Sequence, residues 1–112
     1  MAPSTPLPSR RVRGSTTGRP LMAALDLLGR RWALRVIWEM RADAAPTFRV
    51  LQERCGGISS SVLAQRLREL ADAGVVEHSG QGYALTSQGQ ELLKCLAPLD
   101  RWAAAWRPTR AG

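Results

Sequence analysis

The fold of this chain is decided by one stretch, residues 58–74, which reads ISSSVLAQRLRELADAG. Its leucines recur at intervals of three or four residues: Leu63, Leu67 and Leu70. At about 100° per residue their side chains fall within about 60° of one another, which predicts a helix with one buried face. Ser59 can cap this helix, Ile58 can pack on Leu63 as a hydrophobic staple, and Gly74 supplies the C-terminal stop. Both ends of the helix are therefore predicted from the residues that flank it.

A shorter helix is predicted immediately before this stretch, over residues 47–55. One side of it carries the apolar residues Phe48, Leu51 and Cys55. Two arginines, Arg49 and Arg54, face solvent on the other side. Because Gly56-Gly57 can end the helix in a tight turn, the two helices are predicted to form a helix-turn-helix pair.

Two more helices are predicted nearer the N-terminus. The apolar positions of the first recur at helical spacing and stop near Gly29: Leu21, Ala24, Leu25 and Leu28. The second fits residues 32–42, because the next segment contains Pro46, which forbids continuation. One of its faces is apolar: Ala33, Val36, Ile37 and Met40. Trp38 lies on the other face, where it either packs under a neighbouring helix or lines a dimer or effector site.

Downstream of Gly74 the pattern changes to short strands. Residues 75–78 and 83–85 are predicted to form a hairpin across the glycine-containing segment 79–82. A last helix then starts at Thr86 or Ser87, with Ser87 and Gln90 as a capping box. The predicted fold is mainly α with a small β-hairpin, in the element order of a winged helix-turn-helix.

The charge of the chain points to a polyanionic partner. Its 112 residues contain 16 Lys and Arg against 9 Asp and Glu, which gives a net charge of +7 and a pI near 11.2. Residues 1–20 hold four arginines and no acidic residue, together with four prolines. We therefore expect a disordered basic arm over residues 1–19, one globular domain over residues 20–106 and a tail over residues 107–112.

The predicted second helix of the pair has an exposed face suited to double-stranded DNA. Its N-terminal serines, Ser59, Ser60 and Ser61, place hydroxyl and N–H groups at a positive helix end, where phosphate binds. Further along the same face, Gln65 can pair with adenine and Arg68 with guanine. The remaining candidate DNA contacts are arginines on the two helices: Arg49, Arg54 and Arg66.

Other function classes find little support in the sequence. Two separated cysteines and a single histidine supply neither a zinc site nor a catalytic constellation, so we expect no enzyme activity, no metal and no cofactor. No apolar run reaches membrane-spanning length, and a cytoplasmic protein is expected. The alternative function is a winged-helix module that binds another protein, which an apolar or acidic recognition face would favour.

Several segments, in order and with compatible spacing, also carry a family resemblance: ALDLLGRRW at 24–32, Phe48 with Leu51, GIS at 57–59, VLAQRLREL at 62–70, GVV at 74–76, YALT at 83–86 and Gly89. Over residues 19–106 they resemble the HxlR family of bacterial transcriptional regulators. The resemblance implies a homodimeric winged helix-turn-helix regulator. It further implies that residues 59–73 are the recognition helix and that the first and last helices make the dimer contacts.

Three features depart from the family pattern. Many members have a cysteine just before the proline that opens the first helix, and here that position is Arg19. Sensing by that thiol is therefore excluded. Cys55 stands where the family usually has an aliphatic core residue, and both Cys55 and Cys95 are interpreted as small apolar residues that fill the core, not as redox sensors. The hairpin turn is shorter and less charged than the usual wing, so we expect the basic arm to make backbone contacts in its place.

The last predicted helix carries an apolar stripe that a domain of this size cannot cover. Pro98 interrupts this helix and is expected to kink it. The predicted dimer contacts come from the first and last helices: Leu21, Leu25, Leu96, Leu99, Trp102 and Trp106. Two-fold pairing of two such chains predicts an inverted-repeat operator. A small-molecule effector is possible, but the sequence does not identify one.

Overall fold

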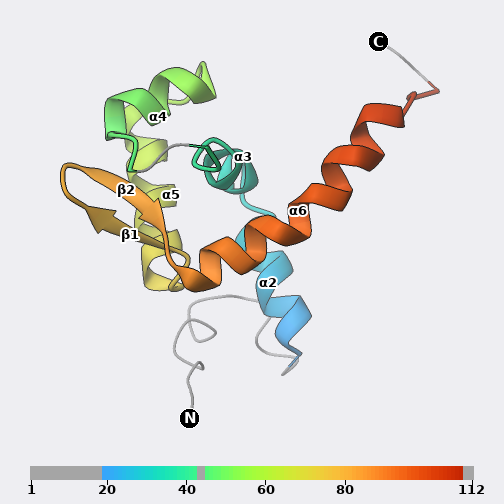
Figure 1. Ribbon diagram of the computed structural model, residues 1–112, viewed down its shortest axis with the longest axis horizontal. Coiled ribbons are helices and arrows are strands. Elements are labelled where there is room, and N and C mark those ends of the chain that lie inside the picture. The colour runs from blue at the N-terminus through green and yellow to red at the C-terminus, as the bar shows by residue number, and fades with distance from the viewer. Residues whose placement is uncertain (1–18, 43–44, 110–112) are drawn as a thin grey trace.

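The structure, a computed structural model, describes residues 19–42 and 45–109. Within these ranges it contains five helices and two strands: α2 (Pro20–Leu28), α3 (Ala33–Trp38), α4 (Phe48–Cys55), α5 (Ser60–Asp72), β1 (Val76–Ser79), β2 (Gly82–Leu85) and α6 (Ser87–Ala105). The predicted element order and fold class are confirmed (Figure 1). Of the predicted arm only Arg19 is described, and residues 110–112 of the predicted tail also lie outside the described residues.

Helix α3 lies at the centre of the fold and contacts α2, α4, α5 and α6. The apolar faces predicted from helical spacing meet in one core. Its fully buried aliphatic side chains come from three helices: Val36 and Ile37 of α3, Leu51 of α4, Leu63 and Leu70 of α5. Burial of these side chains, each contributing about 1.5–3 kcal/mol, holds α4 and α5 in a fixed relation to each other.

Both helices of the helix-turn-helix have a side-chain cap at the N-terminus. The Thr47 hydroxyl accepts a hydrogen bond from the Val50 N–H at the start of α4, over 3.2 Å. The turn after α4 uses Gly57 with φ +104°, a conformation that L side chains rarely adopt. The Ser59 hydroxyl then accepts from the Val62 N–H, also over 3.2 Å. The predicted N-cap of the second helix is therefore confirmed.

Helix α5 ends in a Schellman motif at Gly74, as the glycine predicts. The Gly74 N–H donates to the Ala71 carbonyl over 3.0 Å, and the Val75 N–H donates to the Leu70 carbonyl over 2.9 Å. Gly74 has φ +81°. These bonds turn the chain directly from α5 into the hairpin.

The helix predicted over residues 32–42 is shorter than expected. It spans only Ala33–Trp38, and Trp32 caps it with a left-handed φ of +78°. At its other end, the Arg41 guanidinium donates to the Trp38 carbonyl over 2.9 Å, and the Arg54 guanidinium donates to the Glu39 carbonyl over 3.1 Å. Because these carbonyls accept hydrogen bonds from side chains, the helix can end one turn earlier than the apolar spacing suggests.

The hairpin and the start of α6 also differ from the prediction by about one residue. The strands pair Val76 with Leu85 and Ser79 with Gly82. The N-cap of α6 is Thr86, so the predicted capping box of Ser87 and Gln90 is wrong. The Thr86 hydroxyl accepts from the Gly89 N–H over 3.0 Å and donates to the Gly74 carbonyl. This second bond joins the end of α5 to the start of α6, and Ser87 does not make it.

The hairpin lies close against the segment that precedes α4. The Tyr83 N–H donates to the Pro46 carbonyl over 2.9 Å. A Cβ atom built on Gly82 would overlap the backbone of Ala45 and Pro46, so this close approach requires glycine. Contacts between α6 and β2 and between α3 and α6 then connect the last helix to the domain. No helix in the described ranges has the length and apolar character needed to cross a membrane.

Candidate nucleic-acid interface

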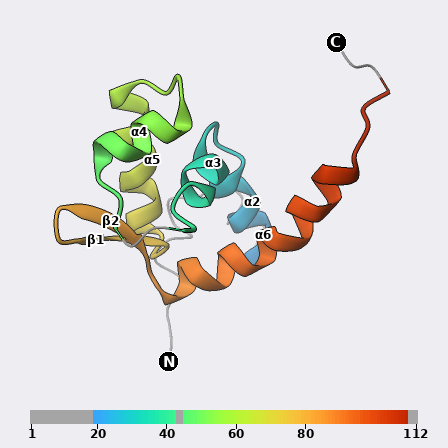
Figure 2. The ribbon, with the colours of Figure 1, turned by 45° about the horizontal axis from the view of Figure 1, so that its top comes forward.

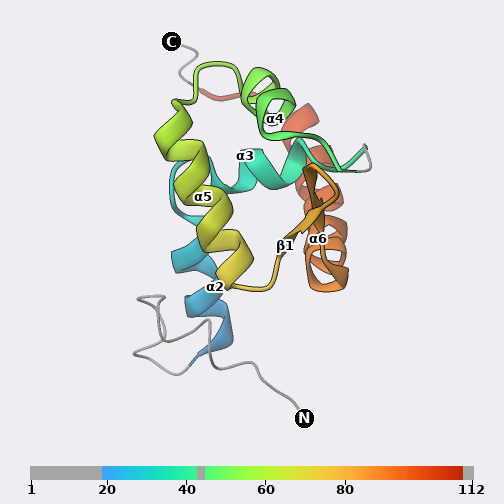
Figure 3. The same cartoon turned by 90° about the vertical axis from the view of Figure 1, so that its left-hand side faces the viewer.

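Helices α4 and α5 and the hairpin share one side of the molecule, with α5 running along it (Figure 3). The side chains predicted to face outward on this helix are exposed: Ser59, Ser60, Ser61, Gln65 and Arg68. Leu63, Leu67 and Leu70 are buried on the other side. The structure therefore places an uninterrupted polar face on α5.

The N-terminus of α5 is held by Gln52 of α4, a residue that no sequence pattern singled out. The Gln52 side chain on α4 donates to the Ser60 hydroxyl over 3.0 Å and to the Ile58 carbonyl over 3.4 Å. These bonds cross the glycine turn and hold the two helices together. Gln52 lies between Leu51 and Glu53 on a helix whose periodicity gave no signal for a polar contact with the next helix.

Gln65 and Glu69 are joined on α5 at i,i+4 spacing. The Gln65 amide nitrogen donates to Glu69 Oε2 over 3.1 Å. The Glu69 carboxylate, only 19% exposed, also accepts from Arg66 Nη1 over 2.9 Å and from Arg30 Nη1 over 3.1 Å. The spacing within α5 could have suggested the first two bonds, but Arg30 lies 39 residues away and could not be found from periodicity.

Two of the arginines predicted to contact DNA donate hydrogen bonds to main-chain carbonyls of the protein. The Arg66 side chain is 17% exposed, and its Nε donates to the Arg31 carbonyl over 2.8 Å. Arg54 is half-buried and donates to the Glu39 carbonyl. Arg49, in contrast, is 83% exposed on α4 and forms only a loose ion pair of 3.7 Å with Glu53. DNA contact by each of these arginines stays a prediction.

A groove of about 310 Å³ separates α5 from the hairpin. Arg68 lines it from the helix, and Glu77, His78 and Tyr83 line it from the strands. The rings of His78 and Tyr83, which are cross-strand partners, lie 4.6 Å apart. The strands and their turn, residues 76–85, contain no Lys or Arg, in agreement with the weakly charged wing expected from the sequence.

The second half of α6 extends away from the domain (Figures 1 and 2). Helix α6 continues through Pro98 to Ala105. Of the predicted dimer residues, Leu96 packs partly against the core, whereas the others are exposed: Leu21, Leu25, Leu99, Trp102 and Trp106. Trp102 and Trp106 are 57% and 53% exposed, and their rings stack at 5.2 Å.

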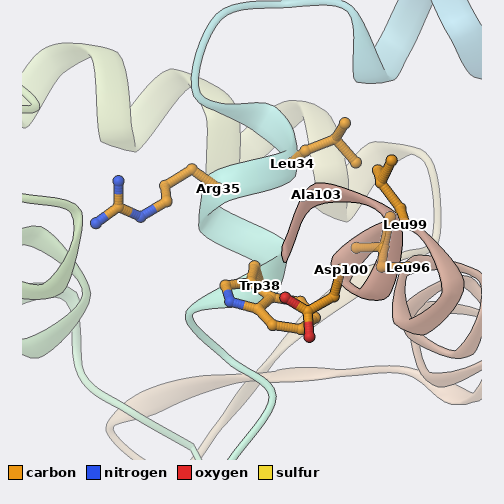
Figure 4. A pocket seen from close by; sticks show the side chains of 7 residues that line it. All are labelled: Leu34, Arg35, Trp38, Leu96, Leu99, Asp100 and Ala103. Atoms are coloured by element: carbon orange, nitrogen blue, oxygen red, sulfur yellow. The ribbon is translucent and has the colours of Figure 1, made fainter. Parts of the chain in front are cut away.

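A second groove, of about 250 Å³, lies between α3 and α6 (Figure 4). Leu34 and Trp38 line it from α3, and Leu99 and Asp100 line it from α6, while the Arg35 side chain points away from it. The Arg41 guanidinium lies 4.3 Å from the centre of the Trp38 ring. Trp38 thus lines a groove between two helices, and a role for it at a dimer or effector site stays a prediction.

The two cysteines differ in their surroundings. Cys55 is a buried core residue, as predicted, and desolvation raises the pKa of its thiol. Cys95 is exposed on α6, so its interpretation as an apolar core residue is wrong. Across the described ranges, no group of three or more His, Cys, Asp and Glu residues could hold a metal ion.

Comparison with known proteins identifies the family that this sequence matches. The sequence model of the HxlR-like helix-turn-helix family matches residues 27–111. An uncharacterized HTH-type transcriptional regulator of Methanocaldococcus jannaschii is 28% identical over 94 residues, which cover 80% of this chain and 87% of that protein.

Two solved structures are similar in both fold and sequence. A possible HxlR family transcriptional factor from Thermoplasma volcanium is 32% identical with a TM-score of 0.69, over 77% of this chain and 83% of the other. The quinone-bound YodB from Bacillus subtilis is 31% identical with a TM-score of 0.70, over 77% of this chain and 97% of the other.

Proposed function

The chain belongs to the HxlR-like helix-turn-helix family of transcriptional regulators, and on that premise we propose that it binds a specific double-stranded DNA operator as a homodimer. The observation that carries this proposal is the polar face of α5. That face is exposed, begins at a capped N-terminus and lies on a helix whose other side is anchored in the core. A helix of this kind can enter the major groove with its N-terminal residues against the bases.

The polar face supplies the groups that base recognition requires. Gln65 can form two hydrogen bonds with adenine, and Arg68 can form two with guanine. The N-terminal serines and the first N–H groups of α5 face a phosphate, which the positive helix end attracts. In this proposal, Gln65 and Arg68 therefore recognise bases. The serines at the start of the helix, Ser59, Ser60 and Ser61, set its position on the phosphate backbone of the DNA.

In this proposal, the arginines of the two helices α4 and α5 contact the phosphate backbone of the DNA. Arg49 is exposed and free to reach a phosphate once its loose pair with Glu53 opens. Arg66 has five guanidinium N–H groups, and its bonds to the Arg31 carbonyl and the Glu69 carboxylate use two of them, so others can bond to phosphate. Arg54, which is half-buried near the end of α4, is the other proposed phosphate contact.

Dimerisation is supported by the exposed apolar surface of α6 and α2. Trp102 and Leu99 on α6, Trp106 directly after it, and Leu21 and Leu25 on α2 are large apolar side chains that are about half exposed or more, and such side chains usually mark an interface. A two-fold dimer would present two α5 helices to one duplex, and the operator would then be an inverted repeat. Because Leu99 also lines the groove between α3 and α6, an effector bound in that groove would touch the proposed dimer surface.

The alternative function, a winged-helix module that binds another protein, is less well supported. Such a module would be favoured by an apolar or acidic recognition face, whereas α5 presents serines, a glutamine and an arginine. The net charge of +7 also favours DNA. We further propose that the protein acts in the cytoplasm and catalyses no reaction, in keeping with relatives that are named as regulators.

Selection from a random pool of DNA duplexes tests this function. The purified full-length protein is expected to enrich one inverted-repeat motif over successive rounds, and the selected duplex should bind at least about a thousandfold more tightly than a scrambled one. A Gln65→Ala, Arg68→Ala double variant serves as the control and should enrich no such motif. If the wild-type protein also enriches no motif, the function as a sequence-specific DNA-binding protein is refuted.

A further inference from the structure

The Glu69 carboxylate is the centre of a hydrogen-bonded cluster beside the exposed face of α5. Its Oε2 accepts from the Gln65 amide nitrogen and from Arg30 Nη1, each over 3.1 Å. Its Oε1 accepts from Arg66 Nη1 over 2.9 Å. A side chain of the proposed base-reading face is therefore bonded to a carboxylate that two arginines hold in place.

This bond restricts the orientation of the Gln65 amide. One end of a glutamine amide only donates hydrogen bonds and the other only accepts them, whereas an ionised carboxylate only accepts. Gln65 must therefore turn its nitrogen toward Glu69 and its oxygen away from it. Of the two orientations related by a flip of the amide, the bond to Glu69 selects one.

The position of Glu69 is itself fixed from outside α5. Arg30 lies in the segment between α2 and α3, where it also forms an ion pair of 3.7 Å with Asp26. Arg66 donates to the Arg31 carbonyl in the same segment. Because the carboxylate is anchored by that segment as well as by its own helix, its bond to Gln65 does not depend on a freely rotating surface side chain.

We propose that Glu69 is a positioning residue for base recognition, which holds the Gln65 amide in the orientation that pairs with adenine. Adenine presents an N6 donor and an N7 acceptor side by side in the major groove. The Gln65 oxygen, turned away from Glu69, accepts from N6. The amide nitrogen has two hydrogens, so one stays on Glu69 and the other donates to N7. This inference rests on the proposed function and assigns a specificity role within it.

Two substitutions of Glu69 distinguish the effect of its side-chain geometry on Gln65 from the effect of its negative charge. Glu69→Gln keeps the length of the side chain but offers Gln65 both a donor and an acceptor, so either amide orientation becomes possible. Glu69→Asp keeps the charge but removes one methylene, and the carboxylate no longer reaches Gln65. Glu53→Gln is the matched control, since it removes the same charge from α4, where Glu53 pairs with Arg49 and not with Gln65.

The experiment measures the preference among the four bases at the operator position that Gln65 contacts. That position is identified as the one where the Gln65→Ala variant no longer prefers any base. Wild-type protein and Glu53→Gln should prefer adenine there, and both Glu69 variants should lose roughly tenfold of that preference. In a Gln65→Ala background, Glu69→Gln should lower the affinity for the operator no further, whereas a purely structural effect of Glu69 would lower that affinity in this background too. Thermal melting identifies the variants that fold, and either Glu69 variant suffices for the test.

The outcomes distinguish this inference from the proposed function. If the wild-type protein selects no DNA motif, the proposed function fails. If it selects one and Gln65→Ala relaxes it, but a folded Glu69 variant keeps the full adenine preference, the positioning role is overturned. A wild-type preference for guanine or thymine at the Gln65 position would also overturn it, because the orientation set by Glu69 matches adenine.

Discussion

At the level of single residues, Arg68 and Arg49 are both exposed arginines of the helix-turn-helix, but they lie on different helices. Arg68→Ala is expected to cost about 1–3 kcal/mol on the selected operator and to relax preference for one guanine, while binding to scrambled DNA changes little. Arg49→Ala is the matched control. It should weaken binding to all sequences alike and reduce the salt slope by about 0.9. Equal losses for Arg68→Ala on operator and scrambled DNA would show that Arg68 does not read a base.

The thiols give a second prediction at this scale. Burial raises the pKa of the Cys55 thiol, so its reactive thiolate forms only at higher pH than usual, whereas Cys95 is exposed. In the folded protein a thiol reagent should modify Cys95 first, and Cys55 only after denaturation. The raised pKa also means that the folded state binds this proton more tightly, so its contribution to stability is lost as pH rises through the thiol range. Rapid modification of Cys55 in a folded Cys95→Ser variant would contradict this account.

Single residues also show what the sequence could and could not predict. Helical spacing correctly separated the exposed Gln65 and Arg68 from the buried leucines, because one helix face determines both sets. The partners that Arg66 and Glu69 have outside α5 were not predictable in the same way, since the Arg31 carbonyl and the Arg30 side chain lie 35 and 39 residues away in the sequence. Such contacts depend on how helices pack, which periodicity within one helix does not encode.

At the level of elements, the start of α6 gives a direct stability test. Thr86→Ala removes the cap on the Gly89 N–H and the bond to the Gly74 carbonyl, and should cost about 1–2 kcal/mol in the free energy of unfolding. Ser87→Ala, one residue later on the exposed first turn, should change stability by less than about 0.5 kcal/mol. Denaturant unfolding of the two variants measures both. A larger loss for Ser87→Ala would place the cap at Ser87 instead.

The contacts at the start of α6 also explain why the N-cap predicted from the sequence, Ser87, is one residue too late. A Ser87 and Gln90 pair fits the capping-box pattern, and nothing in that pattern excludes it. Thr86 is the cap because its hydroxyl can also bond to Gly74, at the end of another helix. Likewise, α3 ends at Trp38 because Arg54 of the next helix donates to the Glu39 carbonyl. Element types were predictable from local patterns, whereas these boundaries depend on tertiary contacts.

At the level of the whole molecule, the exposed half of α6 predicts self-association. A Trp102→Ala, Trp106→Ala double variant should shift from dimer to monomer in sedimentation at micromolar concentration, because it removes the stacked aromatic pair from the proposed interface. Its helical content should stay close to wild type, since neither side chain is buried in the core. Lys94→Ala, an exposed change on the same helix, is the control and should stay dimeric. A dimer unchanged by loss of both tryptophans would place the interface elsewhere.

In the proposed complex, two copies of this chain bring two α5 helices to one inverted-repeat operator. The most direct test is the molar mass of the complex that the full-length protein forms with its selected duplex, measured together with the affinity for a duplex that carries one half-site. We expect two protein chains per inverted repeat and a large loss of affinity on the single half-site. One chain bound to an unrepeated half-site with full affinity would contradict it.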